Sequence, residues 1–272
     1  MVKKKALLIS ILFFCACAIP PTYKRRNVRE EIKKICKKEF NINVVVKDVG
    51  ETIWIYAPFK SILNKDLKIK DEVIDKMRKI SLSISRVLLS LDKPPKFYVT
   101  VVSDIYETGA DIIEIVNFED LKKFFLFYIS DEELADRTVI KSYFNLSALG
   151  DETGTHIPVH DIDFEEFLCE LMVNKLSMYF TNKKIEGIKE IKCDFDGDFY
   201  EIYLETTDEN FKLTEPILKD ILKIFKFFIK IYEYKDFLGI KIYLNNKELE
   251  FFSFKSLENI KPPLRLKSLL QK

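Results

Sequence analysis

Hydrophobic and polar positions follow two rhythms along this chain, one typical of strands and one typical of helices. Segment 43–56 joins two β-favouring runs around Gly50, and segment 96–116 joins two more around Thr108-Gly109, so each predicts a hairpin. Between them, residues 71–91 carry apolar side chains at spacings of three and four, which predicts an amphipathic helix.

The same order returns in the C-terminal third of the chain. Residues 191–204 predict a hairpin with Asp196-Gly197 at its turn, residues 214–232 a helix, and residues 240–254 a second hairpin through Asn245-Asn246. A pattern that recurs in this way indicates two copies of one structural unit. We therefore predict an α+β fold of two related hairpin–helix–hairpin units, each a four-stranded antiparallel sheet covered by its helix.

Capping residues mark the helices outside the two repeats. Asn117 is predicted to cap a helix that runs to Tyr128. Ser130 with Glu133, and Asp163 with Glu166, have the spacing of capping pairs, so the connection between the units is predicted to be mostly helical. The predicted segments are an N-terminal apolar segment (1–16), a tether with a basic amphipathic helix (17–40) and the first unit (41–130). The connection (131–188), the second unit (189–260) and a tail (261–272) follow.

The predicted helix 214–232 is apolar around most of its circumference, and its lysines form one narrow ridge. Such a helix is usually buried on more than one side, here against its own sheet and a predicted helix over residues 164–180. The alternative is a groove for an acyl chain or a partner protein beside Phe225 and Phe228. Trp54 is a further candidate for such a surface, although its place on an alternating strand favours packing against the sheet.

The first residues have the pattern of an export signal. Lysines at positions 3 to 5 precede an apolar run over residues 6–19. This run of about 14 residues is too short to cross a bilayer, which needs about 20 helical residues. It therefore indicates a signal core rather than a membrane-spanning anchor.

The end of this run resembles the signal of bacterial lipoproteins, in which a cysteine after a small residue is lipidated and becomes the new N-terminus. The matching segment is Phe14-Cys15-Ala16-Cys17, and the resemblance covers only about the first 20 residues. It implies cleavage after Ala16 and a lipid on Cys17. Phe14 and Cys15 differ from the residues usual in that family, so Cys15 stays open as the modified residue. The resemblance also implies an exported protein that is anchored in a membrane of the cell envelope.

The charge balance argues mainly against nucleic-acid binding. Without residues 1–16 the chain has 41 basic and 43 acidic residues, whereas nucleic-acid-binding domains are strongly basic. Eight basic residues lie between Lys24 and Lys38, just beyond the predicted lipid. They either contact anionic lipid headgroups or form the solvated face of a helix that packs through its apolar stripe, and we favour packing.

Cysteines beyond the signal give little direction. Cys36, Cys169 and Cys193 stand at unrelated spacings, with no paired-cysteine motif. We expect three thiols, with one disulfide as the alternative in an oxidising compartment.

Candidate chemistry is sparse in this sequence. His156 and His160 are the only histidines, and acidic residues follow them, which makes them the best candidates for a metal site. Pro158 between them disfavours the helix on which they would share an ion, and an extended chain would place them about 13 Å apart. We therefore predict no metal, no cofactor and no catalytic residue, and a hydrolase using these histidines is the least favoured alternative.

Together these patterns predict a membrane-anchored envelope lipoprotein that binds another protein and catalyses no reaction. The main alternative is a carrier of lipid or another small apolar ligand, which would use the apolar helix 214–232.

Overall fold

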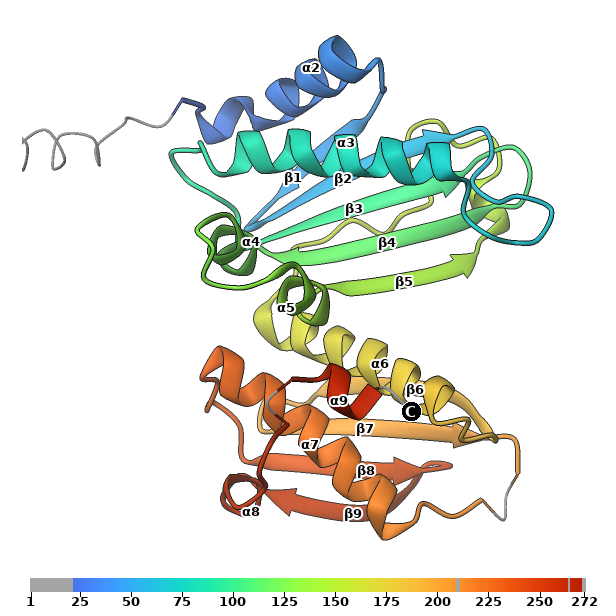
Figure 1. Cartoon of the computed structure of the whole chain (residues 1–272), viewed down its shortest axis with the longest axis vertical. Helices are drawn as coiled ribbons and strands as arrows, with labels where there is room; N and C mark the ends of the chain where they lie inside the picture. Colours follow the sequence, from blue (N-terminus) through green and yellow to red (C-terminus); the bar gives the residue numbers. More distant parts are fainter. Residues whose placement is uncertain (1–21, 209–210, 264, 271–272) are drawn as a thin grey trace, which may run out of the picture.

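The computed structural model describes residues 22–208, 211–263 and 265–270, which form two β-sheets with helices packed against them (Figure 1). The first sheet has the order β1 (Val45–Val49), β2 (Thr52–Phe59), β3 (Phe97–Asp104), β4 (Ala110–Asn117) and β5 (Val139–Phe144). The second sheet has the order β6 (Ile188–Phe195), β7 (Phe199–Thr206), β8 (Gly239–Leu244) and β9 (Lys247–Ser253).

Helices precede, connect and follow the hairpins in both units. They are α2 (Val28–Phe40), α3 (Asp71–Leu88), α4 (Phe118–Phe125), α5 (Asp131–Asp136), α6 (Phe164–Asn182), α7 (Glu215–Tyr232), α8 (Phe254–Glu258) and α9 (Lys267–Leu270), with short 3-10 turns at η1 (Arg25–Asn27) and η2 (Leu146–Ala148). The α+β class and the two hairpin–helix–hairpin units predicted from the sequence are confirmed. The similarity extends further, because each unit runs helix, hairpin, helix, hairpin, helix: α2 to α4 in the first and α6 to α8 in the second.

The prediction of wholly antiparallel sheets is wrong in both units. Strands β2 and β3 are parallel, and so are β7 and β8, while the hairpin partners are antiparallel. The cause is the long helix between the hairpins. It returns the chain to the end of the sheet from which it came, so the next strand runs in the same direction as the last.

The first sheet also has a fifth strand that the sequence analysis did not predict. Strand β5 pairs antiparallel with β4 at the edge of the sheet, inside the stretch expected to be mostly helical. Apart from Val139, its side chains are half-buried or exposed. A strand of this kind lacks the alternation of apolar and polar residues from which strands are predicted.

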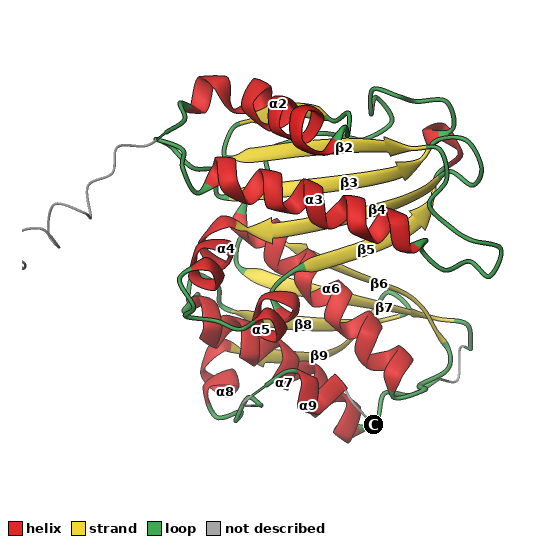
Figure 2. Ribbon diagram, turned by 45° about the horizontal axis from the view of Figure 1, so that its top comes forward, coloured by secondary structure: helices red, strands yellow, loops and turns green. Residues whose placement is uncertain are grey.

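Two hydrophobic cores divide the molecule into layers. One core lies between α2, α3 and one face of the first sheet, and it takes Ile53 and Ile55 from β2. The other core joins the opposite face of that sheet, with Trp54 and Tyr56, to α6, α7 and the second sheet. Helix α6 therefore lies between the sheets, as Figure 1 shows, and the view in Figure 2 shows α3 crossing the outer face of the first sheet.

Helix α2 packs as the favoured interpretation of its sequence predicted. Val28, Ile32, Ile35 and Cys36 are buried in the first core, and most of its lysines and arginines face solvent. Asn41, which follows the helix as its C-cap, adopts the left-handed conformation (φ 56°) that often ends a helix.

The cysteines differ from the expectation of three thiols. Cys169 on α6 and Cys193 on β6 form a disulfide with their Cα atoms 5.1 Å apart, and Cys36 is a buried free thiol. The covalent link fastens the first half of the shared helix α6 to the edge strand of the second sheet.

Candidate binding site between the two sheet units

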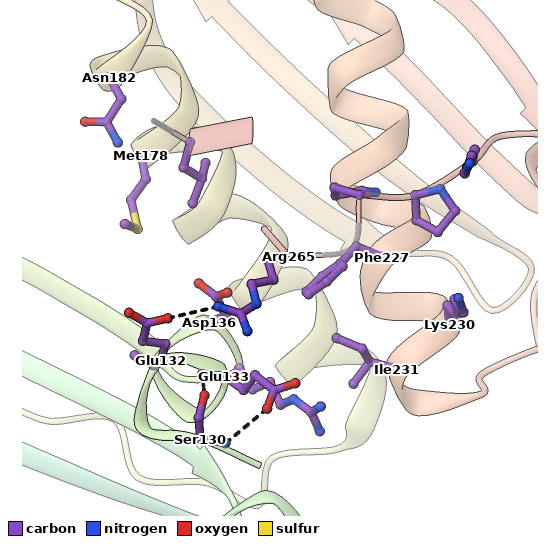
Figure 3. Close-up of a pocket in the computed structure, with 16 residues that line it drawn as sticks. Ser130, Glu132, Glu133, Asp136, Met178, Asn182, Phe227, Lys230, Ile231 and Arg265 are labelled. Carbon is purple, nitrogen blue, oxygen red and sulfur yellow. Dashed lines mark hydrogen bonds and ion pairs between the residues drawn. The ribbon is translucent and has the colours of Figure 1, made fainter. Parts of the chain in front are cut away.

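A pocket of about 620 Å³ lies where the first unit, α6, α7 and the C-terminal segment meet (Figure 3). Four stretches far apart in the sequence form its walls: residues 130–137, the end of α6, the second half of α7, and residues 261–270. Because no single stretch supplies the site, no local motif could have announced it. The sequence analysis predicted only the helices that carry its walls.

The apolar part of the wall comes from α6, α7 and α9. Met178 lies on one side and Phe227 and Ile231 lie opposite, as the labelled side chains of Figure 3 show. Leu270 and the prolines at 262 and 263 complete this surface. Phe227 and Leu270 are buried, so the wall is fixed by packing, whereas the Met178 side chain stays largely accessible to a ligand.

Charged side chains of both signs surround the apolar wall. Helix α5 contributes Glu132 and Glu133, α7 contributes Lys230, and the C-terminal segment contributes Lys261 and Arg265. Arg265 Nη1 lies 3.6 Å from Glu132 Oε2, an ion pair that joins α5 to the C-terminal segment. The rim is therefore polar and electrically mixed.

Helix α5 is held at the rim by its own cap. Ser130 Oγ accepts a hydrogen bond from the Glu133 amide (3.2 Å), and Glu133 Oε2 accepts one from the Ser130 amide (3.0 Å). Figure 3 shows these paired bonds. The capping box predicted for this position is confirmed, and it fixes the backbone from which Glu132 and Glu133 project.

A buried polar network connects the helices that form the pocket walls. Arg137 Nη1 donates to Asp120 Oδ1 (2.8 Å), and the Tyr232 hydroxyl donates to Asp120 Oδ2 (2.6 Å), which ties the end of α5 and α4 to α7. Lys175 Nζ donates to the carbonyls of Ala135 (2.9 Å) and Thr138 (3.3 Å). Burial lowers the pKa of Lys175 to about 8, since the low-dielectric surroundings disfavour its charge.

This arrangement suits a ligand that brings both apolar and charged groups. The volume lies in the range of about 300–1,000 Å³ that is typical of ligand pockets. The apolar wall excludes water from one part of a ligand, and the rim offers carboxylates, ammonium groups and a guanidinium to the rest. The geometry can bind and orient such a ligand.

The predicted surface residues Phe225 and Phe228 do not reach this pocket. Both are buried in the second core, where the Phe225 ring packs edge-on against Tyr200 with their centroids 5.2 Å apart. Helix α7 is buried against both its sheet and α6, the arrangement that the sequence analysis favoured. Of the phenylalanines of α7, Phe227 is the one that lines the pocket.

Trp54 is likewise buried rather than displayed. Its indole Nε1 donates to the His160 carbonyl (2.7 Å), and its ring lies 5.6 Å from the His160 ring. It therefore packs the connecting segment against the first sheet.

The two histidines have separate surroundings. His160 Nε2 lies 2.7 Å from Glu166 Oε1 near the surface, and its pKa is raised: burial lowers it, but contacts with the Pro158 carbonyl and Glu166 outweigh burial. His156 lies between Asp151 (Nδ1–Oδ2 2.7 Å) and Asp111 (Nε2–Oδ2 3.3 Å), and only 2% of its side chain is exposed. Among the described residues no group of three or more metal-ligating side chains is placed to hold an ion.

The cluster around His156 is a buried network of hydrogen bonds. The Ser103 hydroxyl donates to the Asp111 carboxylate, so its proton is directed away from the imidazole that would have to accept it in a hydrolase. Ser103 and Asp111 are fully buried. The cluster instead anchors residues 151–156 to the end of the first sheet.

The open face of the second sheet carries a further cluster of polar side chains, which hydrogen-bond to one another. Glu201 accepts hydrogen bonds from the Tyr203 hydroxyl (2.6 Å), the Tyr243 hydroxyl (3.1 Å) and Lys241 (2.9 Å). The two tyrosine rings stack with centroids 4.7 Å apart. Because these groups pair with one another, the pocket is the stronger candidate site.

Comparison with known proteins adds no relative: no family model, no curated protein and no solved structure matches this chain. The predicted signal peptide, the predicted lipidation site Cys17 and its alternative Cys15 lie outside the described residues. Within the described ranges, no helix is long and apolar enough to cross a membrane.

Proposed function

We propose that this protein is a cell-envelope lipoprotein, tethered through Cys17, that binds a segment of another envelope protein in the pocket between its two units. It acts as an accessory or assembly subunit rather than an enzyme. The resemblance of residues 14–17 to a lipoprotein signal supports the tether, and the pocket supports the binding role.

The observation that carries the proposal is the combination of a water-excluding apolar wall and a rim of mixed charge. Binding energy at protein interfaces concentrates in a few apolar or aromatic side chains that fill such a wall, and polar groups around them exclude water. Met178 on one side and Ile231 on the other would hold an apolar side chain of the partner. Lys230, Lys261 and the Arg265–Glu132 pair would fix the direction of its backbone and charges.

Site-directed photo-cross-linking tests the binding role. A photoreactive amino acid at position 178 should cross-link one protein partner in intact cell envelopes. Leu249 on β9 is the matched control, because Met178 and Leu249 are each 41% exposed and Leu249 does not line the pocket. Met178→Glu should also abolish co-purification of that partner, whereas Leu249→Glu should not.

The competing outcomes are distinct. No partner at position 178, or the same partner at both positions, would contradict the pocket as the binding site. The tether is tested separately with Cys17→Ser, which should release the protein from membranes. Unchanged membrane association would refute lipidation at Cys17.

A second candidate is a carrier of a small amphipathic ligand, which the pocket volume favours. Native mass spectrometry of the purified protein separates the two. A carrier retains a bound small molecule that Met178→Glu displaces, and it gives no protein cross-link at position 178.

A further inference from the structure

An exposed apolar loop follows α4. Its side chains are Leu126, which is 54% exposed, Phe127, which is 94% exposed, and Tyr128, which is 77% exposed. Phe125 before them is also exposed. Four consecutive large apolar residues on a surface usually mark a site of contact with another apolar phase.

The backbone holds this loop in a fixed shape. Helix α4 ends at Phe125, three residues before its predicted end, and Phe127 follows in the left-handed conformation (φ 60°). The Phe127 amide donates to the Phe124 carbonyl (2.9 Å) and the Tyr128 amide donates to the Lys123 carbonyl (2.8 Å). These two bonds form the turn that usually places glycine at this position, so the Phe127 ring is directed outward by an unusual and well-defined backbone.

The loop lies at the end of the molecule from which the N-terminal tether departs. The Tyr23 amide donates to the Ser90 carbonyl (3.0 Å), and the Asp92 amide donates to the Tyr23 carbonyl (3.0 Å), which fixes the chain beside the end of α3. A groove of about 430 Å³ connects that place to the loop, with lining residues Leu88, Leu89, Leu91, Pro94, Phe118, Lys122, Phe125 and Leu126. Figures 1 and 2 both show α4 on the side of the first sheet at which α2 begins.

The tether is short. Tyr23 follows Cys17 by six positions, and a chain of that length spans at most about 20 Å even when fully extended. A lipid on Cys17 would therefore keep this end of the molecule within about 20 Å of the membrane surface.

The charges around the loop are mixed, because basic residues precede it and the acidic first turn of α5 (Asp131, Glu132 and Glu133) follows it. The basic residues at this end are Lys24, Arg26, Lys93 and Lys122. Lys24 lies 3.4 Å from Asp92, and Lys122 lies 3.5 Å from Glu119, so part of the positive charge is balanced within the protein. Long basic side chains beside aromatic ones are typical of proteins at the membrane interface, where the rings enter the headgroup layer and the cations stay in water.

We propose that residues 125–128 form a membrane-docking loop, which inserts its apolar side chains into the bilayer that holds the lipid anchor. This inference rests on the proposed tether at Cys17 and does not depend on what the pocket binds. Docking would give the tethered protein one orientation, with the pocket close to the membrane surface, because the pocket lining begins at Ser130, two residues after the loop.

Fluorescence quenching by lipids tests the insertion. Phe127→Trp is introduced into the full-length protein, which is purified from membranes with its native lipid and reconstituted into vesicles of zwitterionic and anionic lipids. Vesicles with brominated acyl chains should quench the indole introduced at position 127, with a blue-shifted emission, after subtraction of the parent signal from the buried Trp54. The matched control is Phe144→Trp at the far end of β5, where Phe144 is 65% exposed, and it should be quenched little.

Each result leads to a decision. Membrane-bound protein without quenching at position 127, or with equal quenching at 127 and 144, overturns the docking loop and leaves the anchor intact. Shielding of position 127 only after the partner protein is added assigns the loop to a protein interface and also overturns the proposal. Mass spectrometry of Cys17 tests the anchor independently. If Cys17 carries no lipid and the protein does not float with vesicles, the tether at Cys17 and the docking loop are both contradicted.

Discussion

At the scale of single residues, Phe127 combines a strained backbone conformation with an exposed apolar side chain, so it lowers the stability of the fold. A bulky residue in the left-handed region costs about 1–2 kcal/mol relative to a right-handed conformation, and glycine avoids that cost. Phe127 is exposed and recovers almost none of this through burial. Its presence at a helix end where glycine is usual therefore calls for a role outside the folded core.

We expect Phe127→Gly to raise the free energy of unfolding by about 1 kcal/mol, because it removes the backbone strain without removing a packed side chain. Urea denaturation measures the change. Phe127→Ala is the control, since it removes the ring but keeps a Cβ in the strained conformation, and it should give no such gain. A lower stability for Phe127→Gly than for Phe127→Ala would show that the turn is unstrained.

The sequence allowed some single-residue predictions and not others for a physical reason. Caps depend on neighbours three residues apart, so Asn117, Ser130 and Asp163 were predicted correctly as helix starts. The left-handed turn at Phe127 depends on where α4 stops, and no glycine or proline marks that point. The burial of Phe225 and Phe228 depends on what covers α7, which local pattern reveals only as an apolar circumference.

At the scale of elements, one carboxylate shapes the part of the connecting segment that packs against the end of the first sheet. Asp151 Oδ1 accepts the amides of Thr153 and Gly154 (2.9 Å each), and Asp151 Oδ2 accepts the His156 amide (2.9 Å) and contacts the His156 ring. Burial raises the pKa of Asp151, but the hydrogen bonds from His156 and Thr153 outweigh it and hold the pKa far below its usual range. The segment thus owes its shape to an ionised group.

The sign of the pH dependence follows from that lowered pKa. A carboxyl whose pKa is lower in the folded state stabilises the fold above its unfolded pKa, about 3.9, and the contribution is lost as the pH falls through the folded value. We expect Asp151→Asn to lower the free energy of unfolding by about 1.5–3 kcal/mol at pH 7, with the difference from wild type shrinking below about pH 4. Urea titrations from pH 7 to pH 3 measure it, with exposed Glu152→Gln as the control. A difference that is independent of pH would contradict the ionic clamp.

Hairpins and long helices were the elements that sequence could predict, because a turn residue such as Gly50 or Asp196-Gly197 fixes strands that are neighbours in the chain. The parallel pairs β2–β3 and β7–β8 join strands separated by a helix, so nothing in the strands themselves specifies their direction. Strand β5 was missed because its edge position leaves most of its residues unburied. The pocket between units was missed because its walls come from stretches far apart in the sequence.

At the scale of the whole molecule, α6 joins the two sheets through one shared hydrophobic core. It belongs by chain order to the second unit, yet its buried face shares a core with strands β2, β3 and β4 of the first sheet. Phe167 illustrates this position: its ring lies 5.0 Å from Phe97 on β3 and 6.0 Å from Tyr232 on α7. A helix in the core that the two sheets share leaves neither sheet fully covered without it.

We therefore expect a single cooperative unfolding transition, in which Trp54 fluorescence from the first sheet and hydrogen exchange of β7 amides in the second report the same free energy. Phe167→Ala should lower that free energy by about 3–5 kcal/mol, the usual cost of removing a buried aromatic ring, and should lower it equally for both reporters. Phe251→Ala is the control, because Phe251 is exposed on the open face of the second sheet, and it should cost less than about 1 kcal/mol. Separate transitions for the two reporters, or a loss confined to one sheet, would show instead that the units fold independently and that α6 merely rests on the first sheet.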